Sequence, residues 1–323
     1  MSFSVDAGVV TASYVAEKMH LPFQCTYEVA NILQHKDKFR SFLEVNKFEV
    51  PFSRSYSSIS DVLSESEDFE YPIIVKPVDS AGSNGVKRVD DAENLKIAVN
   101  VAFANSHSGK IIIETYLEPL YTSDSDSFVE KGELVYCTFS DQFFDNNAPN
   151  PYVPSAYIWP SSIPEIHTKV LKSELQRLMS LLNIDSGIFN IETRVATNGK
   201  SYIMEVSPRG GGNQIAEMIK NSTGVDLINI EVLHAIGERY EKLPEVNYKK
   251  GIVEIILHSC HELVFDRDNL PEQIDGYVVH KNVWIKEGDK VCVLNKAGDA
   301  FGYAFLCADI SRELRSILYR LES

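Results

Sequence analysis

Two glutamates near the middle of the chain have a spacing that suits metal chemistry. Residues 187–207 read GIFNIETRVA, TNGK and SYIMEVS. Asn198-Gly199 is a strong signal for a tight hairpin turn in which both residues take positive φ. Pairing the strands across that turn places Glu192 directly opposite Glu205, with Cβ atoms roughly 4.5–5.5 Å apart. Two carboxylates at that separation repel each other, so a hard cation such as Mg²⁺ is expected between them.

The same pairing divides the hairpin's side chains between two faces. Asn190 faces Ser207 on the side of the two glutamates. The other side is largely apolar and is expected to be buried; it carries Phe189, Ile191, Val195, Tyr202, Met204 and Val206. An ordinary surface ribbon with two solvated glutamates would have the same pattern, so the hairpin alone does not distinguish the two interpretations.

A second candidate is the lysine that ends the apolar stretch YPIIVKP. A buried ammonium such as that of Lys76 is costly unless it meets an anion. The loop after it, DSAGSNGV, contains Ser80, Gly82, Ser83 and Gly85, and its backbone N–H groups can approach phosphate oxygens. The spacing is not that of a Walker A loop. The alternative is an ordinary hairpin loop with a lysine near solvent.

A third candidate is the end of the apolar stretch KIIIETYL, residues 110–117. Such a stretch predicts a buried strand that ends at Glu114, Thr115, Tyr116 and Leu117. The backbone groups of these residues could face the edge of a base. By itself the segment is also consistent with a core strand that ends in a glutamate. His258 and His261 lie three residues apart in the strand-rich tail, and we interpret that spacing as chance.

The elements that must position these residues alternate between helical and extended patterns. Val9–Met19 and Thr26–Leu33 have helical apolar spacing, and Asp37 is expected to cap a third helix. The polar segment Ser53–Glu70 is expected to be a surface helix or connection, and a β-rich block follows it. The pattern predicts an α+β protein.

Composition excludes several classes of function. The 323 residues include 31 basic and 46 acidic ones, a formal charge of −15, which argues against a nucleic-acid-binding surface. The five cysteines are scattered and form no C-x-x-C, as is usual in a reducing compartment, and this pattern predicts neither a disulfide framework nor a zinc site. No apolar run is long enough to span a membrane. We therefore expect a cytoplasmic protein without nucleic-acid or membrane partners.

The order of the three candidates resembles that of the ATP-grasp superfamily. The motifs that carry the resemblance are YPIIVKPxDSAGSxGV and FNIETR followed by YIMEVSPRGGG, and the likeness covers roughly Ala7 to Glu238. The chain looks most like the carbamoyl-phosphate-synthetase-like members and the amino-acid ligases. The resemblance implies an ATP-grasp fold with a partial N-terminal pre-ATP-grasp segment and a small β-rich C-terminal subdomain. It implies boundaries at 1–70, 71–122, 123–245 and 246–323, the middle two being the small and large ATP-grasp subdomains.

The resemblance also implies a role for each candidate. Lys38 resembles the first lysine on the ATP phosphates, and Lys76 the second. The loop from Ser80 to Gly85 resembles the one that closes over the phosphates. Glu114 to Leu117 resembles the adenine hinge, with the Glu114 carbonyl and the Leu117 amide toward the base. The metal ligands implied are Glu192, Glu205 and, more weakly, Ser207; Arg209, with Lys76, would stabilise the transferring phosphate.

Several features depart from the family pattern. Ser207 stands where many members have a metal-binding Asn, so the number of metals, one or two, stays open. The glutamate that often binds the ribose is absent, and Asp124 or Asp126 could replace it. A separate open question is the glycine run Gly210–Gly212, which could hold an oxyanion or could only form a strand-to-helix turn. The N-terminal domain looks like a second half, so we expect either a truncation or another chain that supplies the rest.

The expected function is an ATP-dependent carboxylate–amine ligase that uses Mg²⁺, with Mn²⁺ as a substitute, and acts through an acyl phosphate. Its partners would be a small-molecule carboxylate and an amine, and a homodimer or a partner chain would fit the short N-terminus. One alternative is a carbamoyl-phosphate-synthetase-like subunit that phosphorylates bicarbonate or carbamate with a partner chain. The other is an ATP-binding subunit without turnover. No motif identifies the carboxylate or the amine.

Overall fold

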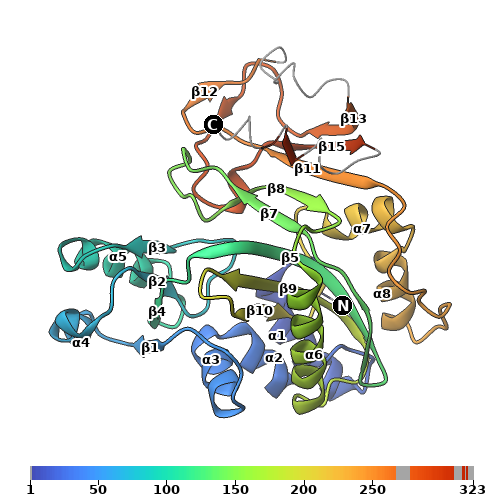
Figure 1. Cartoon of the computed structure of the whole chain (residues 1–323), viewed down its shortest axis with the longest axis horizontal. Coiled ribbons are helices and arrows are strands. Elements are labelled where there is room, and N and C mark those ends of the chain that lie inside the picture. Colours follow the sequence, from blue (N-terminus) through green and yellow to red (C-terminus); the bar gives the residue numbers. More distant parts are fainter. Residues whose placement is uncertain (1, 267–276, 309–314, 317, 319–323) are drawn as a thin grey trace.

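Three helices open the chain in the computed structural model, which describes residues 2–266, 277–308, 315, 316 and 318 (Figure 1). They are α1 (Asp6–Met19), α2 (Tyr27–Gln34) and α3 (Lys36–Val45). The first two were predicted from apolar spacing. The third begins at Lys36, whose N–H bonds to the Val78 carbonyl at 2.9 Å, so Asp37 lies inside the first turn and is not the cap.

The first sheet has four antiparallel strands in the order β1-β4-β2-β3. They are β1 (Ser53–Tyr56), β4 (Ile111–Thr115), β2 (Ile73–Pro77) and β3 (Lys87–Val89), accompanied by α4 (Ile59–Ser64), a 3-10 turn (Ser66–Asp68) and α5 (Ala92–Ala104). A core of aliphatic side chains such as Val75, Leu95 and Ile113 joins α5 to the sheet. The segment 53–70 thus contributes an edge strand as well as the expected short helix.

The second sheet has the order β10-β9-β5-β6 and is also antiparallel. Its strands are β5 (Pro119–Glu130), β6 (Glu133–Cys137), β9 (Gly187–Ala196) and β10 (Ser201–Ser207), and α6 (Glu165–Leu181) packs on one face. Leu171, Leu175 and Leu178 of α6 are fully buried there. The same core includes side chains of α2 and α3, which positions the N-terminal helices below the sheet (Figure 1).

The β9–β10 hairpin brings Glu192 opposite Glu205 and Asn190 opposite Ser207, as predicted. The turn and the register of the strand pairs next to it differ from the prediction. Only Gly199 has positive φ in the turn, and the pairs nearest the turn are shifted by one residue. A β-bulge between Ile203 and Glu205 restores the predicted pairing.

The bulge also changes which side chains are buried in the main core of the second sheet. Ile203 takes the place in that core that Tyr202 and Met204 were expected to share. Tyr202 and Met204 instead pack with Leu117 on the opposite side. The prediction for these two side chains is wrong because a bulge reverses the alternation of a strand.

The third sheet has the order β13-β15-β11-β8-β7 and joins the middle of the chain to its tail. Its strands are β7 (Asp141–Phe144), β8 (Pro154–Trp159), β11 (Gly251–Leu257), β13 (Val278–Val283) and β15 (Gly302–Ala308); the short pair β12 (Leu263–Val264) and β14 (Lys290–Val291) and a 3-10 turn (Ala297–Asp299) lie beside it. The tail is β-rich, as expected, but its strands complete a sheet begun by β7 and β8 (Figure 1). The expected subdomain 246–323 thus shares this sheet with β7 and β8 of the segment 123–245.

Two helices connect the second and third sheets, α7 (Ile215–Thr223) and α8 (Leu227–Ala235). Buried side chains of α7, including Met218 and Ile219, share one core with Tyr157 and Trp159 of β8 and Ile252 of β11. Among the described helices, none is both long and apolar enough to cross a bilayer.

Candidate functional site

The candidate residues surround a cavity of about 340 Å³ between the first and second sheets. The third sheet contributes Gln142, Phe144 and Tyr157 to its wall. The charged side chains that line it are Asp6, Lys36, Arg40, Lys76, Glu114, Asp124, Glu192, Arg194, Glu205 and Arg209. These charged residues, from Asp6 in α1 to Arg209 after β10, thus meet at one place, although they are up to 203 positions apart in the sequence.

Acidic side chains form a row across three neighbouring strands. Asp124 of β5 pairs with Glu192 of β9, which pairs with Glu205 of β10, and all three line the cavity. Glu192 and Glu205 are about one-third exposed toward it. The next row is Asp126, Asn190 and Ser207.

The local electrostatics favour a cation beside the acidic row. Burial raises the pKa of Asp124 to about 7, and the neighbouring Glu192 adds to this effect. The pKa of Glu192 is also raised, chiefly by burial and in part by Glu205, against the influence of Arg194. A pKa raised in this way means that the ionised row is unfavourable by itself. A hard divalent cation is the natural partner for three such carboxylates.

Ser207 does not fit the expected role of a metal ligand. Its Oγ donates to Oδ1 of Asp6 at 3.0 Å and accepts from Nε2 of Gln34 at 3.0 Å. The side chain is buried and does not line the cavity. Asp124, which the sequence suggested only as a ribose ligand, occupies the position beside Glu192 instead.

Arg209 reaches the cavity and is held in place by an acid from the first helix. Its Nε and Nη2 donate to the two oxygens of Asp6 at 2.9 and 2.7 Å, and Nη1 donates to Oδ1 of Asn190 at 3.0 Å. A planar guanidinium bound in this bidentate way is fixed in orientation. Burial would raise the pKa of Asp6, but Arg209, Ser207 and Lys36 together outweigh burial, and the pKa is lowered.

The first lysine of the site is Lys36, not Lys38. Lys36 lines the cavity; its Nζ donates to the Ser80 carbonyl at 2.8 Å and lies 3.6 Å from Oε2 of Glu205. The ammonium of Lys38 bonds to Asn31 at 3.0 Å, away from the cavity. The early start of α3 explains the difference, because the first residue of the helix rather than the third faces the loop.

Lys76 and Glu114 form a buried ion pair with a third member. Oε2 of Glu114 lies 2.6 Å from Nζ of Lys76, and Oε1 lies 2.7 Å from Nε of Arg40. All three residues line the cavity. Burial lowers the pKa of Lys76, and Arg40 and Lys36 add to this, whereas Glu114 opposes it. The Glu114 side chain therefore holds the lysine at the wall of the cavity.

The other hinge and loop candidates divide into two groups. Ser80, Gly82, Ser83, Thr115 and Leu117 line the cavity. The Leu117 amide donates no backbone hydrogen bond within the described residues. Tyr116 and Gly85 are not in the wall. The Tyr116 ring lies under the Arg88 guanidinium, 4.3 Å from its centre, and Gly85 packs where a Cβ would meet Pro77 and Asn105.

The glycine run after Arg209 is a close-packed turn. A Cβ on Gly210 would overlap the Phe3 ring, and a Cβ on Gly211 would meet Asn190 and Asp126. The Gly211 N–H donates to Oδ1 of Asp126 at 2.7 Å and so is not free for an oxyanion. Asp126 therefore supports this turn rather than binding a ribose.

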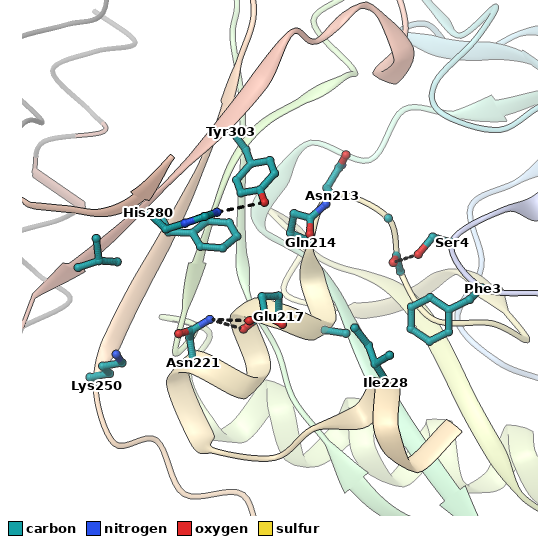
Figure 2. A pocket seen from close by; sticks show the side chains of 15 residues that line it. Phe3, Ser4, Asn213, Gln214, Glu217, Asn221, Ile228, Lys250, His280 and Tyr303 are labelled. Carbon is teal, nitrogen blue, oxygen red and sulfur yellow. Dashed lines mark hydrogen bonds between the residues drawn. The ribbon is translucent and has the colours of Figure 1, made fainter. Parts of the chain in front are cut away.

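A second cavity, of about 670 Å³, adjoins the first (Figure 2). The two share Ser4, Gly212 and Asn213 in their walls. Figure 2 shows Glu217 and Asn221 of α7 on one side and the rings of His280 and Tyr303 on another. Polar and aromatic groups thus surround a space large enough for a small molecule.

The site contains four residues that sequence reasoning missed or gave another role. Asp6 carried no signal, since its partner Arg209 lies 203 positions away. Lys36 and Arg40 stand two residues on either side of Lys38, the position that the resemblance implied. Asp124 was noted, but for a different ligand.

Comparison with known proteins supports this description of the fold. Residues 69–217 match the family model of the ATP-grasp domain. The solved structure of an L-amino acid ligase from Bacillus licheniformis superposes with a TM-score of 0.81 over 99% of this chain and 77% of that one, at 21% identity. A likeness at that identity establishes the fold.

Two curated relatives cover most of the chain. The uncharacterized protein y4rH of Sinorhizobium fredii is 23% identical over 87% of this chain and 58% of its own length. The carbamoyl phosphate synthase large chain of Clostridium botulinum is 24% identical over 84% of this chain and 25% of its own length. The chain thus spans only part of the relatives that it matches.

Proposed function

Because residues 69–217 match the family model of the ATP-grasp domain, we propose that the chain is an ATP-grasp protein and an ATP-dependent ligase that joins a carboxylate to an amine through an acyl phosphate. The observation that carries the proposal is the meeting of three acids and three cations at one cavity. The acids are Asp124, Glu192 and Glu205, and the cations are Lys36, Lys76 and Arg209. Phosphoryl transfer depends mainly on positioning and charge neutralisation, which this set provides.

The acidic row is the proposed Mg²⁺ site. Glu192 and Glu205 would supply carboxylate oxygens, and Asp124 replaces Ser207 as the third candidate. The support for a metal here is that the three carboxyl groups lie opposite one another on adjacent strands and that the pKa values of Asp124 and Glu192 are raised. When bound, the metal neutralises phosphate charge, the usual contribution of Mg²⁺ to phosphoryl transfer.

The remaining wall suits a nucleotide. Lys36 and Lys76 carry ammonium groups toward the cavity beside the Ser80–Ser83 loop, and Thr115 and Leu117 line it beyond Glu114. We assign the base to the Leu117 side, because its amide donates no other backbone bond. At the phosphate end of the cavity, Arg209 would contact the transferred phosphoryl group. Asp6 and Asn190 hold its guanidinium in a fixed orientation.

The second cavity is the proposed site of the carboxylate and the amine. Its support is the wall that it shares with the nucleotide cavity at Gly212 and Asn213, next to Arg209. A carboxylate bound there would lie beside the proposed phosphate end. Attack of an amine on the acyl phosphate would then form the C–N bond and release phosphate.

The experiment measures ADP release with pools of carboxylates and amines. Turnover that needs both substrates is expected for the wild type and is expected to fall at least 100-fold in Glu205→Gln. Turnover with bicarbonate alone would favour the carbamoyl-phosphate-type alternative, and ATP-dependent thermal stabilisation without turnover would favour a binding subunit.

A second experiment compares ATP binding by Lys36→Met and Lys38→Met, which form a matched pair. We expect the ATP dissociation constant to rise at least tenfold in Lys36→Met and less than twofold in Lys38→Met. Equal effects would contradict the assignment of Lys36.

A further inference from the structure

A third group of chemically active side chains lies outside both cavities. Asp145 follows β7, and His258 and Cys260 follow β11; these strands run in the same direction on either side of β8, so their ends lie at the same edge of the third sheet. Nε2 of His258 lies 3.1 Å from Oδ2 of Asp145, and Sγ of Cys260 lies 3.0 Å from the same oxygen. One donor atom from each residue lies within 4.8 Å of the others.

The orientation of the His258 ring is set by its other nitrogen. Nδ1 lies 2.7 Å from the Ile256 carbonyl oxygen, which can only accept, so Nδ1 carries a proton. Nε2, the other ring nitrogen, faces Oδ2 of Asp145 at 3.1 Å, a geometry that serves either an ion pair with the carboxylate or a shared metal ion. A histidine that donates one N–H to a backbone carbonyl is the usual arrangement behind a metal ligand.

Asp145 is oriented in a similar way. The Asn147 N–H donates to its Oδ1 at 2.8 Å, which leaves Oδ2 for His258 and Cys260. The side chains of Asp145 and His258 are 20% and 14% exposed, so an ion can enter and the surroundings still fix the ligands. A backbone hydrogen bond thus supports each of these two ligands.

We propose that Asp145, His258 and Cys260 bind a divalent transition metal, with Zn²⁺ as the best match. A thiol, an imidazole and a carboxylate are the ligand types that Zn²⁺ takes, at about 2.3, 2.0–2.1 and 2.0–2.2 Å. Tetrahedral geometry at those lengths separates ligand atoms by about 3.4–3.6 Å. The separation of Nε2 and Oδ2 would need to increase by about 0.3 Å, and that of Sγ and Oδ2 by about 0.6 Å. Three protein ligands leave a fourth position for water.

The place of this site in the fold gives it a structural consequence. Asp145 begins the segment 145–153, which contacts the loop proposed to cover the phosphates. Nδ2 of Asn150 donates to the Ser83 carbonyl at 2.9 Å, and Oγ of Ser83 donates to the Tyr152 carbonyl at 2.6 Å. A metal at Asp145 would fix the base of this segment. Metal binding itself does not depend on the proposed ligase activity.

The test is a Co²⁺ titration of the metal-stripped full chain, followed by visible absorption and then by displacement with Zn²⁺. We expect a thiolate-to-cobalt charge-transfer band that saturates with one equivalent of Co²⁺; the acidic row has no thiol and gives no such band. In Cys260→Ser and His258→Gln we expect the affinity to fall at least tenfold, and the band to vanish in Cys260→Ser. Cys292→Ser and His261→Gln are matched controls, since Cys292 is an exposed free cysteine and His261 lies outside the group.

Thermal melting provides a second measurement that separates lost binding from lost folding. Zn²⁺ is expected to raise the melting temperature of the wild type and both controls but not of Cys260→Ser or His258→Gln. The proposal is overturned if the wild type binds no cobalt, or if the band survives in Cys260→Ser. It is also overturned if each ligand variant melts below the wild type by the same amount with and without metal. That result would mean that the three side chains only hydrogen-bond to one another and bind no metal.

Discussion

The buried carboxylate of Glu114 allows a quantitative test of how the site is held together. The residue is 2% exposed and lies between Lys76 and Arg40, at 2.6 and 2.7 Å. Burial alone would raise the pKa of Glu114, but Arg40 and Lys76 lower it from 4.5 to about 2. At about 1.36 kcal/mol per pKa unit, the difference corresponds to about 3 kcal/mol of folding stability at neutral pH.

Glu114→Gln removes this charge and leaves two buried cations without their partner. We expect the free energy of unfolding at pH 7 to fall by about 3 kcal/mol, within the range for breaking a buried ion pair. A lowered pKa gives stability that is present above the unfolded value of 4.5 and is lost as pH falls toward 2. The difference in free energy of unfolding between wild type and variant should therefore be smaller by roughly 1 kcal/mol at pH 4 than at pH 7.

The assay is chemical denaturation of both proteins at pH 7 and pH 4. Glu65→Gln is the matched control, since Glu65 pairs with Arg54 at the surface, where solvent screens the pair and its contribution to stability is small. If Glu114→Gln is as stable as Glu65→Gln at pH 7, the carboxylate does not stabilise the fold as reasoned. A difference that does not change between the two pH values would refute the assigned pKa.

Three further changes test other parts of the site. Asp124→Asn should raise the melting temperature at pH 8, because a pKa raised to about 7 means stability lost as pH rises from 3.8 through 7, and should weaken Mg²⁺ binding at least tenfold by calorimetry. Ser207→Ala should change Mg²⁺ affinity less than twofold, since protein partners already occupy the hydroxyl, and should cost about 0.5–1.5 kcal/mol of stability in denaturant melts. Gly210→Ala should cost about 1–3 kcal/mol, because its Cβ overlaps the Phe3 ring, and should speed proteolysis near the N-terminus.

The acidic pair of the hairpin was predictable because its signals are local. An Asn-Gly turn and strand alternation are enough to bring Glu192 opposite Glu205, and the structure confirms that pairing. The hairpin nevertheless departs from the predicted pairing at two places, and the two departures compensate each other. The turn shifts the register by one residue, and the bulge near Met204 shifts it back. A single sequence gives no clear sign of either irregularity.

The residues that depend on distant contacts were not predictable in the same way. Asp6 reaches Arg209 only because α1 packs beside the glycine turn, and no spacing rule connects the two. The exchange of Lys38 for Lys36 follows from the contact of α3 with Val78. The joining of β11 to β8 likewise needs the whole third sheet. Sequence patterns located the site, and tertiary packing decided which neighbours complete it.

Each cation of the proposed phosphate site already has an acidic partner. Arg209 is bound by Asp6, Lys76 by Glu114, and Lys36 lies 3.6 Å from Glu205. The first two pairs are nearly buried, whereas Glu205 is about one-third exposed and belongs to the proposed metal row. Under the ligase proposal, a metal on Glu205 would release Lys36 for phosphate, so metal and nucleotide should bind cooperatively.

Removing the charge of Glu205 tests whether metal and nucleotide binding are coupled, as distinct from whether the substitution simply damages the site. In EDTA, Glu205→Gln should bind ATP about two- to fivefold more tightly than the wild type, because Lys36 keeps only its hydrogen bond to the Ser80 carbonyl and no longer faces a competing carboxylate, and such an ion pair is worth up to about 1 kcal/mol. With Mg²⁺ present the order should reverse, because the variant lacks a metal ligand. Calorimetry under both conditions measures the difference. Weaker binding by the variant in EDTA would mean that Glu205 positions Lys36 for the nucleotide instead of competing with it.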